Sequence, residues 1–389
     1  MQVYLDNGNT TPVDERVLDE MEPFYIDKFG HPLFIYQRGR EANEAVEESR
    51  QIIADTIAAD EKDLIFTSGA TEANDIALRG VAKARKKDGD HIIVSKVENP
   101  GILRIAEKLE EEFDVDYLDV DEKGFVNLDE LSDLIREDTI LVSIAHVCGE
   151  IGTIQPMQEI GSIIAEENSD AYFHSNLVNS YGFVPVEFEK FNLDLATFDA
   201  HRIHGPKGVG ALVKSLDVEI EPVNFGYLSL SNLRPGIENV PGIIGLRKAA
   251  ELAFNDFEEK VDKIKSLRDM LIEGIENRVD DVVLHGPIGE ARSPANVNFS
   301  FKNVEGESVM MQLDMRGISV ATGSACATRK LEPSHVLTAI GVESVVAHGA
   351  IRFTLSRMNT EEEINYVLGE VTEVVEGLRK ISPMGREGD

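Results

Sequence analysis

Residues 63–72 read Asp-Leu-Ile-Phe-Thr-Ser-Gly-Ala-Thr-Glu. Along this stretch the predicted local structure changes from a strand to a turn and then to a helix. The apolar run predicts a short buried strand, and Ser68-Gly69 predicts a tight turn of small residues. Thr71, with Glu72 close behind it, indicates the start of a helix. A strand that leads through such a turn into a helix is typical of a βαβ unit, so this stretch favours an α/β fold.

The same alternation continues along the chain. Short apolar runs at residues 91–95, 139–144, 171–174 and 195–198 are separated by polar segments of helical length. This spacing predicts a mostly parallel sheet with helices between its strands. Residues 247–279 show one long helical pattern that could connect this sheet to a second unit.

The length of 389 residues predicts more than one domain. We expect an N-terminal arm over residues 1–15 that joins the small domain, and a large α/β domain over 16–255. We also expect a small α+β domain over 256–389 that carries the cysteine loop. In it, residues 296–301 and 350–355 alternate polar and apolar side chains, which predicts two half-buried strands.

The chain is strongly acidic, with 71 Asp and Glu against 38 Lys and Arg and a net charge of −33. This charge argues against binding to nucleic acid or to an anionic membrane surface. The first residues show neither a basic stretch nor an apolar stretch, so we expect no secretory signal, and no run of about 18 apolar residues predicts a membrane span. The two cysteines, Cys148 and Cys326, fit a reducing compartment, so we expect a cytoplasmic protein.

Two stretches carry candidate chemistry. The turn before Thr71 offers backbone N–H groups and a hydroxyl to an anion, although the same turn also serves helix packing. Cys326 stands among small and polar residues on a predicted loop. An ionised loop thiol is a nucleophile or a metal ligand, but composition alone leaves an inert role open.

Six motifs with distinct residues occur in one order along the chain. They are Tyr4-Leu-Asp-Asn, Phe66-Thr-Ser-Gly-Ala-Thr-Glu, Glu150-Ile-Gly-Thr, His204-Gly-Pro-Lys-Gly, Gly323-Ser-Ala-Cys and Ile351-Arg-Phe. Together they resemble the cysteine desulfurases of iron–sulfur cluster assembly, over essentially the whole chain. The resemblance implies the class V aminotransferase fold (fold type I of pyridoxal-phosphate-dependent transferases) and a homodimer. It also implies a loop cysteine that receives sulfur from cysteine as a persulfide and passes it to a scaffold protein.

The resemblance assigns roles to several residues. Cys326 matches the loop cysteine, and Arg352 matches the arginine that binds the substrate carboxylate, a task suited to a guanidinium fork. Ala70 and Thr71 match the phosphate-binding turn. His201 matches the histidine before the Schiff-base lysine.

Other positions depart from the family pattern. Arg202 replaces the Schiff-base lysine, and Asp199 replaces a serine that bonds the cofactor phosphate. Lys207 matches a separate lysine of the family. Further departures at cofactor contacts are Asn99, Asn176, Asn179 and Ile237, with the larger Leu33 and Phe34 near the N-terminus.

From these departures we predict a degenerate family member whose pocket is filled or repurposed, with Arg202 paired to Asp199. On this interpretation the chain neither binds pyridoxal phosphate nor desulfurates cysteine. It docks an IscU-type scaffold as a homodimer. Cys326 is then a sulfur acceptor or a ligand of an iron–sulfur cluster of the 2Fe–2S type shared with the scaffold.

Two alternatives stay open. The chain could be an active pyridoxal-phosphate-dependent desulfurase that passes persulfide sulfur from Cys326, or a carboxylate or protein binding module that uses Arg352. Cys148 maps to the cofactor site. It could meet Cys326 as a redox pair or as a second metal ligand, or it could simply fill the core.

Overall fold

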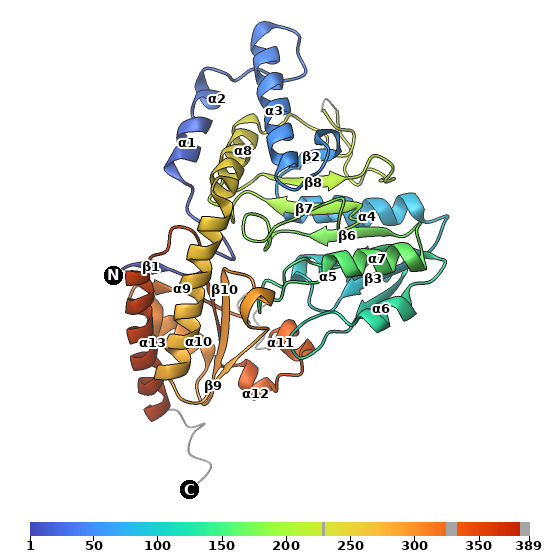
Figure 1. The fold of residues 1–389 in the computed structure, drawn as a ribbon. Helices are drawn as coiled ribbons and strands as arrows, with labels where there is room; N and C mark the ends of the chain where they lie inside the picture. The colour runs from blue at the N-terminus through green and yellow to red at the C-terminus, as the bar shows by residue number, and fades with distance from the viewer. Residues whose placement is uncertain (228–229, 324–332, 382–389) are drawn as a thin grey trace.

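A seven-stranded sheet forms the centre of the molecule in the computed structural model, with strand order β2-β8-β7-β6-β5-β3-β4 (Figure 1). The structure describes residues 1–227, 230–323 and 333–381. The strands are β2 (Leu64–Thr67), β3 (His91–Ser95), β4 (Asp114–Leu118), β5 (Thr139–Ser143), β6 (Tyr172–Asn176), β7 (Leu195–Asp199) and β8 (Gly210–Lys214). Strands β3 to β7 pair in parallel, whereas β8 runs antiparallel to both β7 and β2. The predicted mostly parallel sheet is therefore confirmed.

Helices cover both faces of this sheet because its strands are apolar on both sides. On one face Ile92 of β3 packs in a core with Ala77 of α4, and on the other Ile93 packs in a core with Val46 of α3. Asn99 begins α5 by accepting a hydrogen bond from Gly101 N–H. The helices of this part are α1 (Glu15–Met21), α2 (Pro23–Ile26), α3 (Gln37–Asp55), α4 (Ala70–Arg85), α5 (Pro100–Leu109), α6 (Leu128–Leu134), α7 (Met157–Glu167) and α8 (Val240–Phe254).

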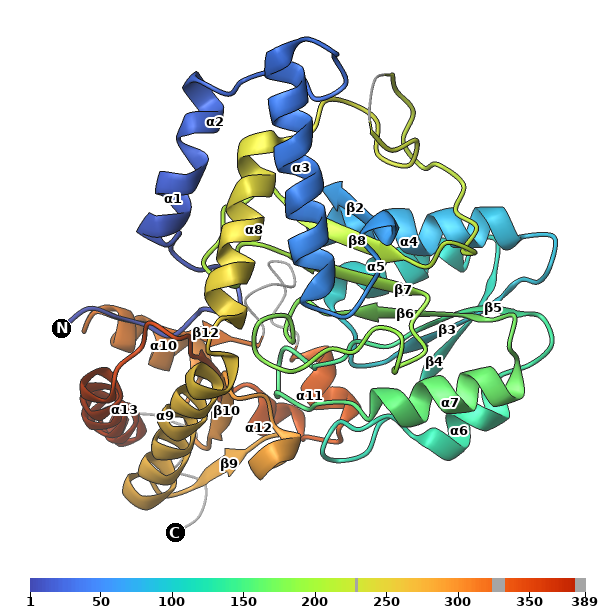
Figure 2. The ribbon, with the colours of Figure 1, turned by 45° about the horizontal axis from the view of Figure 1, so that its top comes forward.

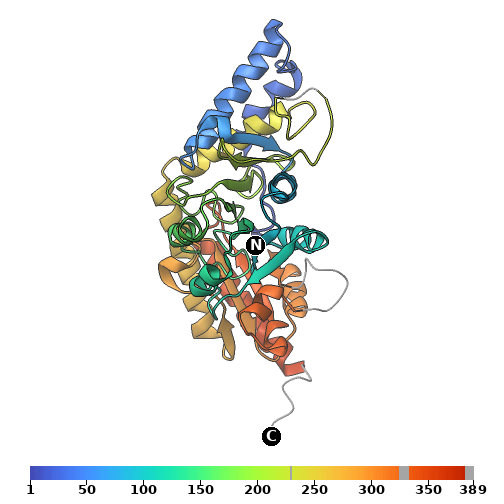
Figure 3. The ribbon, with the colours of Figure 1, turned by 90° about the vertical axis from the view of Figure 1, so that its right-hand side faces the viewer.

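The C-terminal part is an antiparallel sheet of order β12-β13-β10-β9 covered by helices. Its long helices α9 and α13 lie side by side, and Figure 3 shows the orange and red C-terminal part at the opposite end of the molecule from the blue helices near the N-terminus. Its elements are α9 (Phe257–Arg278), β9 (Val282–Leu284), β10 (Asn296–Phe301), α10 (Gly306–Asp314), β11 (Ile318–Ser319), β12 (Ala321–Thr322), α11 (His335–Ala339), α12 (Ser344–Ala347), β13 (Ala350–Thr354) and α13 (Glu361–Ile381). Short 3₁₀ helices occupy Glu61–Asp63 and Gly289–Ala291.

The N-terminal segment crosses to this C-terminal part (Figure 2). Strand β1 (Val3–Tyr4) pairs in parallel with β11, and Asp6 bridges to Thr354 at the end of β13. Arg357 then joins the two parts, because it donates to Asp14 Oδ2 at 2.8 Å and to the carbonyl of Ile203 at 3.2 Å. The first residues thus brace the junction between the two sheets.

Two sequence predictions need correction. Residues 247–279 form two helices, since α8 ends at Phe254, α9 begins at Phe257, and Asp256 between them has a φ of +50°. Short polar residues adopt this left-handed conformation more readily than others. Strand β10 is buried on both faces, because its polar side chains point to other polar groups: Asn298 donates to the Glu150 carbonyl, and Ser300 bonds His285. Within the described residues, no helix is long and apolar enough to cross a membrane.

Replacing Arg357 by alanine removes the cation from a partly buried pair and leaves Asp14 without one of its partners. We expect a loss of about 3–5 kcal/mol in the free energy of unfolding, measured by urea denaturation. The exposed pair of Lys190 and Glu187 provides the control, and Lys190→Ala is expected to cost less than about 1 kcal/mol. Equal losses in the two variants would contradict a bracing role for Arg357.

Candidate active site

A cavity of about 330 Å³ opens beyond the carboxyl ends of β3, β5 and β6, where parallel α/β sheets bind ligands. Loops of the large sheet form one wall, and β12, β13 and α11 contribute the other. Its volume lies in the range of small-molecule sites. The residues singled out from the sequence that line it are Asn99, Cys148, Asn176, Asn179, Arg202 and Arg352.

A second hollow of about 360 Å³ begins at the N-terminus of α4, and Asn9 lines both hollows. It brings together Ala70, Thr71, His201 and Lys207, which lie far apart in the sequence. The first N–H groups of a 16-residue helix favour an anion, and Lys207 adds a positive charge. This hollow therefore has the chemistry of an anion cradle.

The backbone at the start of α4 leaves room for a ligand. Gly69 has a φ of +146°, and a Cβ added there would meet nothing within 4 Å. Glu72 turns back to accept the N–H of Ser68, so this donor is already used. The remaining first-turn N–H groups lie beside the open space.

Asp199 lines the cradle together with Glu72, and it also contacts the histidine of the cradle. Its Oδ1 lies 3.3 Å from Nδ1 of His201. Burial raises the pKa of Asp199, and the positive charge of Arg202 only partly offsets this rise. Burial also lowers the pKa of His201, against the opposing effect of Asp199. Burial thus outweighs the attraction for both groups, so each ionises less readily than it does in water.

The pocket is open, which contradicts our expectation that bulky residues fill it. Leu33, Phe34 and Ile237 are 36%, 46% and 61% exposed, so these side chains lie on the surface rather than in the cavity. Arg202 lines the cavity wall and donates from Nη1 to Asn179 Oδ1 at 2.6 Å. The changes of residue type therefore leave the space of the site intact.

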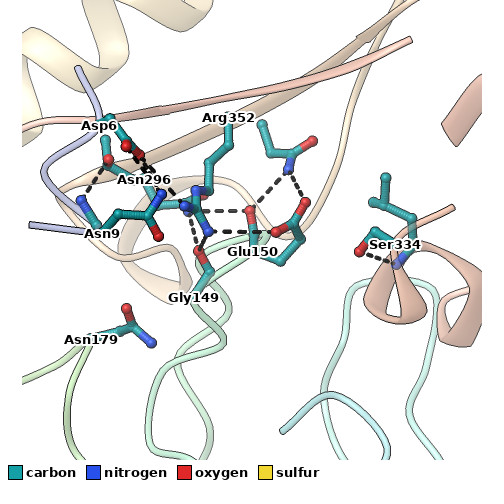
Figure 4. A network of polar contacts seen from close by, with 12 residues as sticks. Asp6, Asn9, Gly149, Glu150, Asn179, Asn296, Ser334 and Arg352 are labelled. Atoms are coloured by element: carbon teal, nitrogen blue, oxygen red, sulfur yellow. Dashed lines mark hydrogen bonds and ion pairs between the residues drawn. The ribbon is translucent and has the colours of Figure 1, made fainter. Parts of the chain in front are cut away.

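Arg352 on β13 stands between two carboxylates (Figure 4). Its Nη2 lies 3.7 Å from Asp6 Oδ1, and its Nη1 lies 3.5 Å from Glu150 Oε2. Nη1 also lies 3.4 Å from the carbonyl oxygen of Gly149. A largely buried guanidinium needs such counter-charges, and its fork suits a carboxylate ligand.

The loop of Gly149 and Glu150 is held by amides of β10. Asn296 Nδ2 donates to both loop carbonyls at 3.2 Å, and Asn298 donates to the Glu150 carbonyl at 3.0 Å. Arg292, which is fully buried, donates in turn to Asn296. This chain of bonds fixes the position of Glu150 beside Arg352.

Glu98 ends a buried hydrogen-bonded chain that crosses the sheet. Its carboxylate accepts from Ser143 Oγ, which bonds Nδ1 of His174 at 2.9 Å. His174 Nε2 lies 3.4 Å from Thr197 Oγ1, and Thr197 donates to Asn74 on α4. Burial raises the pKa of Glu98 to about 7 and lowers that of His174 to about 3.

Cys148 lies in the cavity wall and is only 2% exposed. Burial raises the pKa of its thiol to about 11, so it remains protonated and unreactive at neutral pH. Cys326, and with it the predicted cluster-ligand and redox-pair roles, lies outside the described residues. Within the described ranges, no three His, Cys, Asp or Glu side chains come together as a metal site.

The class-V aminotransferase family model matches residues 3–367. The chain belongs to this family. Within it the chain belongs with the cysteine desulfurases: it is 46% identical over 387 residues to cysteine desulfurase IscS of Dictyoglomus turgidum, covering 99% of this chain and 98% of the relative. It is 44% identical over 383 residues to cysteine desulfurase IscS of Methanosarcina thermophila, covering 98% and 94% of the two chains.

Solved structures agree with this assignment. A NifS-like protein superposes with a TM-score of 0.91 at 37% identity, covering 97% of this chain and 100% of its own. SspA in complex with cysteine superposes with a TM-score of 0.80 at 30% identity, covering 92% and 100%. The predicted class V aminotransferase fold is therefore confirmed.

The comparisons contradict our predictions that the chain is a pseudoenzyme and that it does not bind pyridoxal phosphate. Relatives named cysteine desulfurase match it from end to end, and a NifS-like structure shares its fold. Those predictions were based on altered cofactor contacts, which we expected to leave a filled or repurposed pocket, and the hollows are open. Position 202 still holds an arginine where the family motif has the Schiff-base lysine, so any activity has to proceed without a lysine at this position.

The sequence motifs indicated no role for Asp6, Glu98 or Glu150. Asp6 and Glu150 both lie in motifs that were recognised, and Glu98 directly precedes Asn99. The sequence offered one signal for these residues, which is that each is an acidic residue among apolar residues or glycines. The partners that define their environment come from distant segments and become visible only in the fold.

Replacing Glu98 by glutamine tests the buried carboxyl. Because its pKa is raised by folding from 4.5 to about 7, its contribution to stability is complete below pH 4.5 and is lost as pH rises through 7. We expect Glu98→Gln to gain about 3 kcal/mol over the native chain between pH 4 and pH 8 in urea denaturation. Glu276→Gln, on the exposed face of α9, should show no such pH-dependent gain. A difference between Glu98→Gln and the native chain that does not change with pH would contradict the raised pKa.

Proposed function

We propose that the protein is a cysteine desulfurase that uses pyridoxal phosphate and passes sulfur from cysteine as a persulfide on Cys326. The end-to-end match to cysteine desulfurases at 46% identity is the observation that carries this proposal. The open cavity, the anion cradle and Arg352 at the cavity wall support it. The homology is strongest as evidence because it spans both parts of the fold.

The cofactor fits the site in volume and in the chemistry of the cradle. Thr71, Lys207 and the first N–H groups of α4 would hold its phosphate, and the cavity at Asn176 and Asn179 would receive the rest. When bound, the cofactor supplies an electron sink for bonds at the α-carbon of an amino acid. Arg202 cannot form an imine, so retention rests on the cradle and the cavity rather than on a covalent bond at that position.

The chain's own residues then perform binding and transfer. Arg352 binds the carboxylate of cysteine at the wall of the cavity, which orients the substrate for transfer. The thiolate of Cys326 takes the sulfur: a sulfur–sulfur bond forms, the carbon–sulfur bond of the substrate breaks, and that carbon accepts a proton. The inert Cys148 does not compete for this sulfur.

The acceptor of the persulfide is proposed to be an IscU-type scaffold in the cytoplasm, and the working unit a homodimer. Exposed apolar side chains lie at the end of α2, on the connection from α2 to α3, and at positions 225, 227 and 237, which supports burial against a second copy. They include Ile26, Phe29, Ile35, Phe225, Tyr227 and Ile237, all at least 61% exposed.

Persulfide formation tests the proposal directly. We expect purified protein incubated with pyridoxal phosphate and cysteine to retain the cofactor's absorbance after desalting and to carry a persulfide on the Cys326 peptide in mass spectrometry. Cys326→Ser should lose this label and at least about 100-fold in sulfide release, because the nucleophile is gone. No retained cofactor and no persulfide, or a label on Cys148 instead, would sink the proposal.

Arg202→Lys tests how position 202 limits the cofactor. A lysine amine can form a covalent bond to the cofactor that arginine cannot. We expect this variant to retain pyridoxal phosphate through extensive dialysis and through borohydride reduction. Arg202→Gln, which adds no amine, is the matched control. Equal retention by the two variants would show that residue 202 does not face the bound cofactor.

A further inference from the structure

Asp199 presents a buried carboxyl oxygen that no hydrogen bond from the described residues satisfies. The residue is 5% exposed at the end of β7 and lines the anion cradle. His201 Nδ1 approaches its Oδ1 to 3.3 Å but makes no hydrogen bond with it. Thr10 Oγ1, which belongs to the same hollow, is likewise buried without a partner in the described part of the chain. Because unpaired buried polar atoms cost free energy, two of them on one hollow point to a ligand that would complete them.

The other acid of the cradle is already engaged by its own surroundings. Glu72 accepts the N–H of Ser68, and its Oε1 lies 3.6 Å from Nε of Arg234. Its charge is therefore partly offset on the side where it points. Asp199 has no comparable hydrogen bond at Oδ1, so its protonation state decides how the cradle treats an anion.

The charged groups around Asp199 come from three segments. His201 and Arg202 follow β7, Lys207 precedes β8, and Glu72 lies in the first turn of α4. The N-terminal segment adds an amide and a hydroxyl to the hollow, and these do not titrate. Burial raises the pKa of Asp199, while Arg202 and His201 lower it by a smaller amount. The carboxyl group therefore takes a proton more readily than it does in water.

A phosphate in this hollow would lie beside Asp199. A phosphate monoester carries close to two negative charges at neutral pH, and an adjacent anion raises the pKa of a carboxyl group further. A carboxylate would repel such a ligand, whereas a protonated carboxyl group has an O–H that a phosphate oxygen can accept. Burial and the bound anion thus act on Asp199 in the same direction.

We infer that the cradle binds a phosphate monoester together with one proton, which Asp199 takes up from solvent and donates as a hydrogen bond to a phosphate oxygen. The serine of the family pattern donates at this position at every pH, but Asp199 donates only when it is protonated. The inference rests on the proposed function, in which the cradle holds the phosphate of the cofactor. It deepens that function by making retention of the phosphate depend on pH through a residue particular to this chain.

Calorimetric titration of the full chain with phenyl phosphate tests this coupling. The probe is an aromatic phosphate monoester that cannot form an imine, and with a second pKa near about 6 it is a dianion at pH 8. Titrations in buffers of different ionisation enthalpy count the protons that accompany binding. We expect uptake of about 0.5–1 proton per ligand at pH 8, and an affinity that falls about three- to tenfold from pH 7 to pH 8.

Two variants of Asp199 remove the titrating group and keep a donor. Asp199→Asn copies the shape of the protonated acid, and Asp199→Ser restores the hydroxyl of the family pattern. We expect both to bind phenyl phosphate with less than about 0.2 proton taken up, and with an affinity that changes less than about twofold between pH 7 and pH 8. Asp262→Asn, on the exposed side of α9, is the matched control and should keep the native uptake.

Infrared difference spectroscopy identifies the group that takes the proton. We expect phenyl phosphate to induce the carbonyl stretch of a protonated carboxyl group in the native chain and not in Asp199→Asn. Proton uptake without this band would assign the proton to His201 and overturn the inference. Uptake that persists in both variants of Asp199 would also overturn it, as would a native chain that binds the probe without a proton or does not bind it.

The outcomes separate this inference from the proposed function. Proton-coupled binding of phenyl phosphate without persulfide on Cys326 would refute desulfuration and leave the role of Asp199 standing. Retained pyridoxal phosphate and persulfide on Cys326, with no proton taken up by the native chain, would refute the role of Asp199 and leave the desulfurase standing.

Discussion

A buried cation between two carboxylates from distant segments is the constraint on which the site depends. Arg352 comes from β13, Asp6 from the segment after β1, and Glu150 from the loop after β5. Removing one partner of such a buried set leaves an uncompensated charge, which typically costs about 3–5 kcal/mol. The N-terminal segment, the large sheet and the small sheet therefore have to meet at one point. The cavity exists because they meet there.

Much of the fold was predictable because it is encoded locally. Residues 63–72 contain β2, the turn and the start of α4, and the structure shows all three. The break between α8 and α9 was missed because both helices carry the same periodicity and only Asp256 departs from it. The burial of β10 was missed for a different reason. Alternating polar residues normally face water, but here Asn296 and Asn298 face the backbone of the loop that carries Glu150.

The site was less predictable, since residue type does not say where a side chain goes. Large residues at family cofactor positions suggested a blocked pocket, yet Leu33, Phe34 and Ile237 point to the surface of the chain. Comparing motifs shows which position of the fold a residue occupies, but it does not show where the side chain points. The volume of the pocket depends on the path of the backbone. The hydrogen-bonded chain from Glu98 to Asn74 shows the same limit, because its members come from different strands and helices that only the sheet brings into line.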